Sequence, residues 1–223
     1  MVKESLLDSW VFFKNNMVVI ALIILPILAP IEILSAIYEY NFMSEDGGPI
    51  ELLIPMAVEF SVYPIYAAGT VFYIASIVSG ETINVKMSWA LALKYWSSFM
   101  ILSIMVWILA TLGLALLIIP GIVVFVRYAF AEFELLLNGL SPLDSMRVSW
   151  GSTKQYMWVI LGGYTIITIV TYVPYYLFLS VFEDQTSVLY WVLYIAADLI
   201  YTVFTMLYVV FSFRIYGFAQ AQT

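Results

Sequence analysis

The chain has 223 residues, of which 64% are hydrophobic and only 10% are charged. Soluble domains carry about 25% charged residues, so this composition excludes an ordinary water-soluble fold and indicates an integral membrane protein. There is no cysteine and no histidine, and the formal net charge is −7. Without cysteine and histidine, thiolate chemistry and histidine-based catalysis are excluded. The negative net charge argues against a function in binding nucleic acid. We expect a non-enzymatic protein without a cofactor or a metal site.

Six apolar stretches of spanning length follow one another along the chain. They cover residues 17–38, 52–79, 97–119, 121–137, 156–182 and 188–216. Backbone groups in hydrocarbon must be paired within their own segment, so we predict an all-α membrane protein with six transmembrane helices. The spans occupy nearly the whole chain, which makes residues 1–223 a single integral membrane domain with no space for a separate catalytic domain.

Local sequence signals refine the predicted spans. Aromatic residues at positions 10, 12 and 13 precede the first apolar run, which predicts an uncleaved span and no signal peptide. Prolines within the first, second and fifth spans predict kinks. The pair Pro120 and Gly121 predicts a tight turn that joins the third and fourth spans into a hairpin. Gly162 and Gly163 predict a close helix approach in the fifth span.

Basic residues mark one side of the predicted topology. Seven of the eight basic residues lie near the chain ends or in the connections between spans two and three and between spans four and five, which are all on the same side of the predicted membrane. They are Lys3, Lys14, Lys86, Lys94, Arg147, Lys154 and Arg214. The opposite connections contain only acidic charges, from Glu39 to Glu51 and at Glu183 and Asp184. By the positive-inside rule we expect both termini to be cytoplasmic.

A weak internal repeat divides the chain into three units, at about 1–80, 81–139 and 140–223. With an offset of 140 residues, seven of the sixteen positions from Ser5 to Ile20 are identical to their counterparts, including Ser9 with Ser149 and Trp10 with Trp150. A third copy begins at Ser88 and Trp89. Each copy precedes two spans. We therefore expect three repeats of an interfacial amphipathic helix followed by a helical hairpin.

The leading segments carry tryptophan and basic side chains suited to the membrane interface. The third has strong helix-start signals, because Ser141 can cap it, Pro142 fits the first position and Asp144 suits the positive end. Anchoring at the membrane surface is the simpler reading, and a specific site for an anionic phospholipid headgroup is the alternative. The predicted interfacial lipid-facing residues are Trp10, Lys14, Trp89, Lys94, Arg147, Trp150 and Lys154.

Four ionisable residues fall inside the predicted spans, where unpaired charge is costly. They are Glu59, Arg127, Glu132 and Asp198, and each lies in the second span of a repeat unit. We predict that they form an intramembrane polar cluster in which Arg127 pairs with Glu59 and Asp198. Such a cluster is either a structural ion pair or a hydrated functional site.

The region around the fourth span resembles a known family. Residues 118–123 (IIPGIV), 127–131 (RYAFA) and 138–149 (NGLSPLDSMRVS) are similar to the YciC family of bacterial inner-membrane proteins. They also resemble the membrane domain fused to some glycerophosphodiester phosphodiesterases. The resemblance implies a six-span inner-membrane protein of the bacterial envelope, and it carries over no hydrolase activity because the catalytic domain is absent.

Three classes of function remain after these exclusions. The favoured one is a non-enzymatic multi-pass protein of the bacterial inner membrane that binds lipid or a protein partner, or forms homo-oligomers, in envelope maintenance. The alternative is a small transporter or channel that uses Glu59, Arg127 and Asp198. An intramembrane enzyme is the weakest class, because the carboxylates lack histidine, cysteine or any catalytic motif.

Overall fold

The computed structural model describes residues 1–42, 49–182 and 187–221. Eight α-helices and one short 3-10 helix (η1) make up nearly all of the described chain. In order they are α1 (Val2–Phe42), α2 (Pro49–Ser79), α3 (Val85–Leu116), α4 (Ile118–Arg127), α5 (Ala131–Asn138), α6 (Pro142–Ser152), η1 (Thr153–Tyr156), α7 (Met157–Leu179) and α8 (Val188–Gln220). The prediction of an all-α protein is therefore confirmed for the described residues.

Five helical segments of the described chain are long and apolar enough to cross a membrane. They are α1, residues 53–79 of α2, α3, the stretch from α6 through α7, and α8. This supports a membrane protein. The predicted fourth span, residues 121–137, is not one of them, because the chain there forms the two short helices α4 and α5.

The interruption of the predicted fourth span is stabilised from outside the helix. The turn runs from Tyr128 to Phe130, and side chains of α6 and η1 satisfy its backbone. Ser149 Oγ donates to the Arg127 carbonyl at 2.8 Å and accepts from the Phe130 amide at 3.1 Å, and Thr153 Oγ1 donates to the same carbonyl at 3.0 Å. A break at membrane depth is tolerated only where protein supplies such partners.

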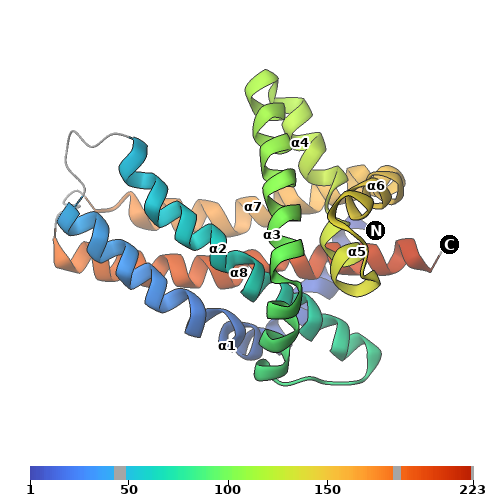
Figure 1. The fold of residues 1–223 in the computed structure, drawn as a ribbon, viewed down its shortest axis with the longest axis horizontal. Helices are drawn as coiled ribbons and strands as arrows, with labels where there is room; N and C mark the ends of the chain where they lie inside the picture. Colours follow the sequence, from blue (N-terminus) through green and yellow to red (C-terminus); the bar gives the residue numbers. More distant parts are fainter. Residues whose placement is uncertain (43–48, 183–186, 222–223) are drawn as a thin grey trace.

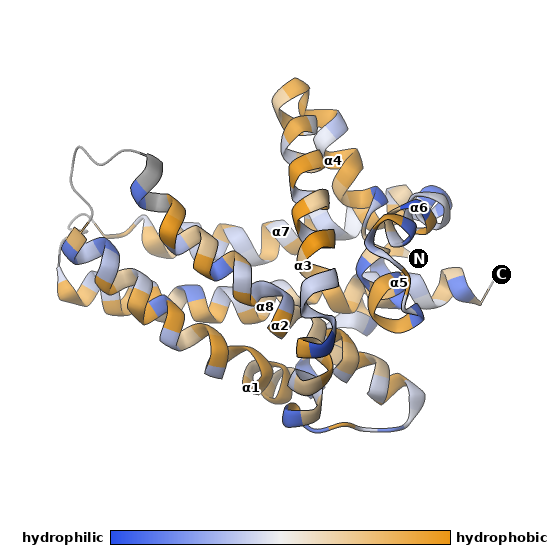
Figure 2. Cartoon of the chain, viewed as in Figure 1, coloured by the Kyte–Doolittle hydropathy of each residue, from blue (hydrophilic) through white to orange (hydrophobic). Residues whose placement is uncertain are grey.

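The α3–α4 hairpin stands apart from the other long helices. In Figure 1, α1, α2, α7 and α8 run side by side along the long axis of the molecule, whereas α3 and α4 cross that direction and project beyond it. The projecting part is strongly apolar (Figure 2). Leu116, Leu117, Ile118 and Ile119 at its tip are all more than two-thirds exposed, as expected for side chains that face lipid.

The turn of this hairpin lies close to its predicted place. The helices break at Leu117, and Pro120 lies within the first turn of α4 instead of at the break. Gly113 and Gly121 lie against each other, since a Cβ on Gly113 would be 2.8 Å from the Gly121 Cα. The absence of both side chains is what lets the two helices approach so closely.

Two tryptophans attach α3 to the kinked helices beside it. The Trp89 indole donates to the Ile23 carbonyl of α1 at 2.9 Å, and the Trp96 indole donates to the Ser61 carbonyl of α2 at 2.8 Å. Each carbonyl lies three residues before a proline, Pro26 or Pro64, where the ring disturbs the helical hydrogen bonds. Trp89, predicted to face lipid, is therefore partly buried, and its indole is held by α1.

Only the third predicted interfacial helix is a separate element. The segments at the start of α1 and α3 continue into the long helices without a break, whereas α6 is turned relative to α7 (Figure 1) and joined to it by η1. The predicted cap of α6 is confirmed, because Ser141 Oγ accepts from the Asp144 amide at 3.2 Å. The two ends of the described chain lie at the same end of the molecule as α5 and α6 (Figure 1).

Candidate functional site: a cavity beside the crossing hairpin

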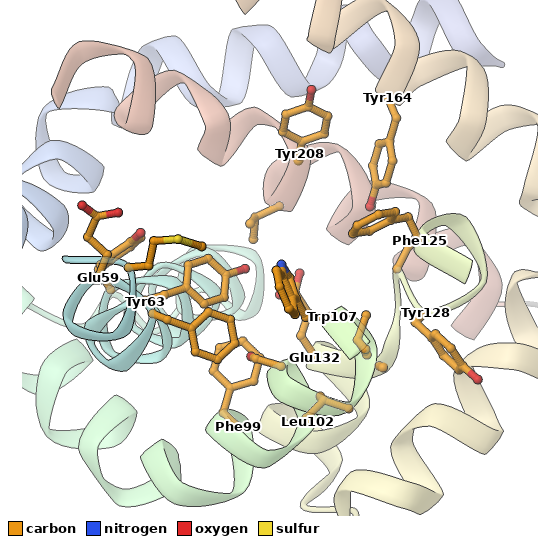
Figure 3. A pocket seen from close by; sticks show the side chains of 18 residues that line it. Glu59, Tyr63, Phe99, Leu102, Trp107, Phe125, Tyr128, Glu132, Tyr164 and Tyr208 are labelled. Carbon is orange, nitrogen blue, oxygen red and sulfur yellow. The ribbon is translucent and has the colours of Figure 1, made fainter. Parts of the chain in front are cut away.

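The space where the α3–α4 hairpin crosses the bundle contains a cavity of about 520 Å³. It lies between α2 and α3 on one side and the α4–α5 turn, α7 and α8 on the other (Figure 3). Its lining residues are Met56, Glu59, Phe60, Tyr63, Tyr66, Phe99, Leu102, Ser103, Val106, Trp107, Phe125, Tyr128, Ala129, Ala131, Glu132, Tyr164, Tyr208 and Val209. The volume suits a ligand of lipid-segment or drug size.

The mouth of the cavity opens on the apolar surface of the molecule. Met56 of α2, Trp107 of α3 and Phe125 of α4 line it and are each about half exposed, at 52%, 51% and 45%. These three belong to segments that are predominantly apolar on the outside (Figure 2). The exposed part of the lining is therefore apolar.

Two carboxylates lie among the apolar walls. Glu59 occupies one edge of the cavity, and Glu132, the second residue of α5, lies near Trp107 in the view of Figure 3. Both side chains are partly buried. Within the described part of the chain, neither has a hydrogen-bond or salt-bridge partner. An unpaired carboxylate in this environment marks a candidate site.

Tyrosines complete the polar lining. The hydroxyls of Tyr164 and Tyr208 are already engaged, with Ser212 at 2.7 Å and with Thr168 at 2.6 Å. The Tyr63 ring lies beside that of Phe99 in a tilted arrangement, with ring centroids 6.2 Å apart, and its hydroxyl points toward the middle of the cavity (Figure 3). Tyr63 therefore offers a donor and acceptor beside Glu132, whereas Tyr164 and Tyr208 mainly shape the walls.

Arg127 lies away from the carboxylates with which it was predicted to pair. Its guanidinium donates to the Trp150 carbonyl of α6 and lies over the Trp150 ring, 4.7 Å from the ring centroid. Among the described residues it forms no salt bridge. The predicted ion pair with Glu59 and Asp198 is therefore wrong, because the chain breaks directly after Arg127 and directs this side chain to α6.

Asp198 belongs to a different part of the molecule. Its carboxylate accepts a hydrogen bond from Tyr175 of α7 at 3.1 Å, and it does not line the cavity. The structure thus brings together Glu59 and Glu132 from the predicted cluster and places Arg127 and Asp198 elsewhere. Sequence reasoning missed the aromatic walls, because their residues are spread from α2 to α8 and resemble ordinary helix-packing side chains.

The predicted interfacial residues, apart from Trp89, are on the surface. Lys14, Lys94, Arg147 and Lys154 are exposed. Trp10 and Trp150, which the repeat aligns, are each 42% exposed. Arg147 pairs with Asp144 at 3.2 Å. These positions are compatible with contact to headgroups, and none of them lines the cavity.

Glu134, close to Glu132 in sequence, has a structural role. Its carboxylate accepts from Asn138 Nδ2 at 2.6 Å and from Gln220 Nε2 at 3.4 Å, and Asn138 also donates to the Tyr216 hydroxyl at 3.0 Å. This network fastens α5 to the end of α8. Glu132 therefore stands out as the carboxylate of α5 that lacks a protein partner in the described structure.

Comparisons with protein-family models, with curated proteins and with solved structures found no match to this chain.

Proposed function

We propose that this chain is a non-enzymatic multi-pass membrane protein that binds a membrane amphiphile in the cavity beside the α3–α4 hairpin. One observation carries the proposal: a cavity of about 520 Å³ has apolar residues as its exposed lining and contains Glu132, a carboxylate without a partner among the residues that the structure describes. Apolar walls suit an alkyl chain, and Glu132 suits a polar group at its end.

The lining residues favour one kind of headgroup. No lysine or arginine is among the described residues that line the cavity, so no basic side chain among them compensates a bare anion. Carboxylates and the Tyr63 hydroxyl bind groups that donate hydrogen bonds, such as an amine. We infer that the cavity ligand carries an amine or another donor-rich headgroup. Anionic phospholipid is better suited to the exposed basic residues, where each contributes about 1 kcal/mol of attraction near an anionic surface.

The setting of this activity is proposed from the sequence. The basic residues at the chain ends and in alternate connections of the sequence support cytoplasmic termini. The resemblance to the YciC family supports the bacterial inner membrane and a role in the envelope. A transporter or channel built on Glu59, Arg127 and Asp198 has less support, because these three side chains do not lie around a common space.

Filling the cavity tests the proposal. Ser103 of α3 lines the cavity, and Ser97 is an exposed residue of the same helix that does not line it. We expect Ser103→Trp to retain fewer copies of amine-bearing lipid per protein than the wild type, as counted by native mass spectrometry. Ser97→Trp is the matched control and retains it. Equal lipid retention by the two variants contradicts binding in the cavity.

A further inference from the structure

A second cavity, of about 410 Å³, lies at the end of the molecule that holds both chain ends. It is formed by the start of α1, the end of α2 and the end of α8. Its lining residues are Asp8, Ser9, Val11, Phe12, Asn15, Ile74, Val78, Val210, Phe213 and Arg214. It shares no lining residue with the cavity beside the hairpin, so the two are independent.

Charges of both signs lie together in this second cavity. Arg214 of α8 pairs with Asp8 of α1 at 2.8 Å, across 206 residues of sequence. Both side chains remain about half exposed, at 49% and 54%, so a ligand can reach each of them. The guanidinium also lies 5.1 Å from the ring centroid of Phe218.

Ser9 adds a hydroxyl that lacks a partner. The residue is only 3% exposed, and its Oγ has no hydrogen-bond partner in the described structure. A buried polar group without a partner is unfavourable. Ser9 lines the cavity, and a rotation of its side chain toward the cavity brings the hydroxyl within reach of a ligand oxygen.

The aligned serine shows what such a position can bind. Ser149, the counterpart of Ser9 at an offset of 140 residues, is fully buried and bonds both the Arg127 carbonyl and the Phe130 amide. Each serine precedes a tryptophan, and each has an arginine nearby: Arg127, the last residue of α4, or Arg214, which lies within α8 and lines the second cavity. At Ser149 these backbone groups satisfy the hydroxyl. Among the described residues, no backbone group does the same for the Ser9 hydroxyl.

We propose that this second cavity binds the phosphoethanolamine headgroup of a phospholipid. The phosphate binds Arg214 and the Ser9 hydroxyl, and the ammonium group binds Asp8. The acyl part lies along the apolar lining, which includes Ile74, Val78 and Val210. A zwitterion satisfies both members of the ion pair, whereas a purely anionic headgroup leaves Asp8 facing like charge.

The test uses the full chain in nanodiscs of phosphatidylcholine that contain 10% of either phosphatidylethanolamine or phosphatidylglycerol. All variants carry Ser103→Trp, so that lipid bound in the first cavity does not contribute. Native mass spectrometry then counts retained lipid. We expect retained phosphatidylethanolamine to exceed phosphatidylglycerol about tenfold, which corresponds to about 1.4 kcal/mol. Arg214→Gln abolishes retention of both lipids, and Asp8→Asn removes the preference between them.

Matched controls are available on α6. Arg147 and Asp144 form an exposed ion pair at 3.2 Å that lines neither cavity, so Arg147→Gln and Asp144→Asn keep the preference. If Arg214→Gln retains as much phosphatidylethanolamine as Arg147→Gln, the proposal is overturned. Thermal stabilisation by water-soluble glycerophosphoethanolamine as strong as that by the lipid overturns the assignment to a lipid. The proposed function is tested separately, by the loss of lipid from the first cavity in Ser103→Trp. If that loss is observed but the second cavity shows no preference for phosphatidylethanolamine, only the further inference is wrong.

Discussion

Arg127 shows how a buried cation is accommodated without a carboxylate. It is 7% exposed, and its guanidinium has the Trp150 carbonyl and ring as partners, while its own carbonyl accepts from Ser149 and Thr153. A hydrogen bond to a charged group contributes about 1.5–3 kcal/mol. The residue thus holds the broken end of α4 onto α6.

Replacing Arg127 tests this account. We expect Arg127→Leu to lower the free energy of unfolding by about 1–3 kcal/mol, since the buried Trp150 carbonyl loses its charged donor. The exposed Arg147→Leu is the control and changes stability by less than about 0.5 kcal/mol. Thermal unfolding in detergent measures both. Adding Glu59→Gln or Asp198→Asn to Arg127→Leu restores no stability, because neither carboxylate faces Arg127; restoration by either would favour the ion pair.

Ser149 and Ser145 offer a second comparison at the residue scale. Both are fully buried in α6, but Ser149 bonds the turn after α4, whereas the Ser145 hydroxyl has no partner in the described structure. We expect Ser149→Ala to cost about 1–3 kcal/mol by leaving the buried Phe130 amide unpaired. Ser145→Ala is neutral or stabilising. Denaturation in detergent distinguishes them, and equal losses would contradict a role of Ser149 in the turn.

At the scale of elements, the sequence predicted what depends on local chemistry. Apolar length located most of the spans, and the cap of α6 follows from Ser141, Pro142 and Asp144 alone. The break between Arg127 and Ala131 was missed because it contains neither glycine nor proline, and its stabilising partner Ser149 is distant in sequence. The same limitation hid the bond from Trp89 to Ile23.

The close approach of α7 to Phe211 of α8 requires a glycine at position 163. A Cβ on Gly163 would lie 2.1 Å from the Phe211 ring, which is fully buried, whereas the nearest atom to a Cβ on Gly162 belongs to Val2, at 3.8 Å. This confirms the predicted close approach at Gly163. We expect Gly163→Ala to destabilise the fold by about 1–3 kcal/mol through overpacking, and Gly162→Ala to be tolerated. Thermal melting in detergent compares them, and equal melting temperatures would contradict the contact.

At the scale of the whole molecule, the crossing hairpin creates the cavity. Trp89 and Trp96 fix α3 against α1 and α2. The break after Arg127 separates α4 from α5, and α5 brings Glu132 to the cavity. From the sequence, Glu59 and Glu132 could be recognised as unusual, but the cavity that unites them could not. Its walls come from helices far apart in the chain.

The proposed topology is directly testable because the chain contains no cysteine. Lys86, Lys154 and Tyr40 are exposed. Lys86 and Lys154 belong to the sequence connections that carry basic residues, and Tyr40 precedes an acidic connection. We expect Lys86→Cys and Lys154→Cys to be shielded from an impermeant thiol reagent in intact cells and Tyr40→Cys to react. The opposite pattern would place the termini outside the cytoplasm.

The central claim is that the cavity beside the α3–α4 hairpin selects an amphiphile with a donor-rich headgroup. The most direct measurement is photo-crosslinking in the native membrane with benzoylphenylalanine at Phe60, which lines the cavity, and at Tyr176, an exposed aromatic residue of α7 that lines none of the described cavities. Mass spectrometry identifies the attached lipids. We expect amine-bearing lipid to be enriched at position 60 relative to position 176, which reports the bulk membrane. The same lipid composition at both positions would contradict a selective site.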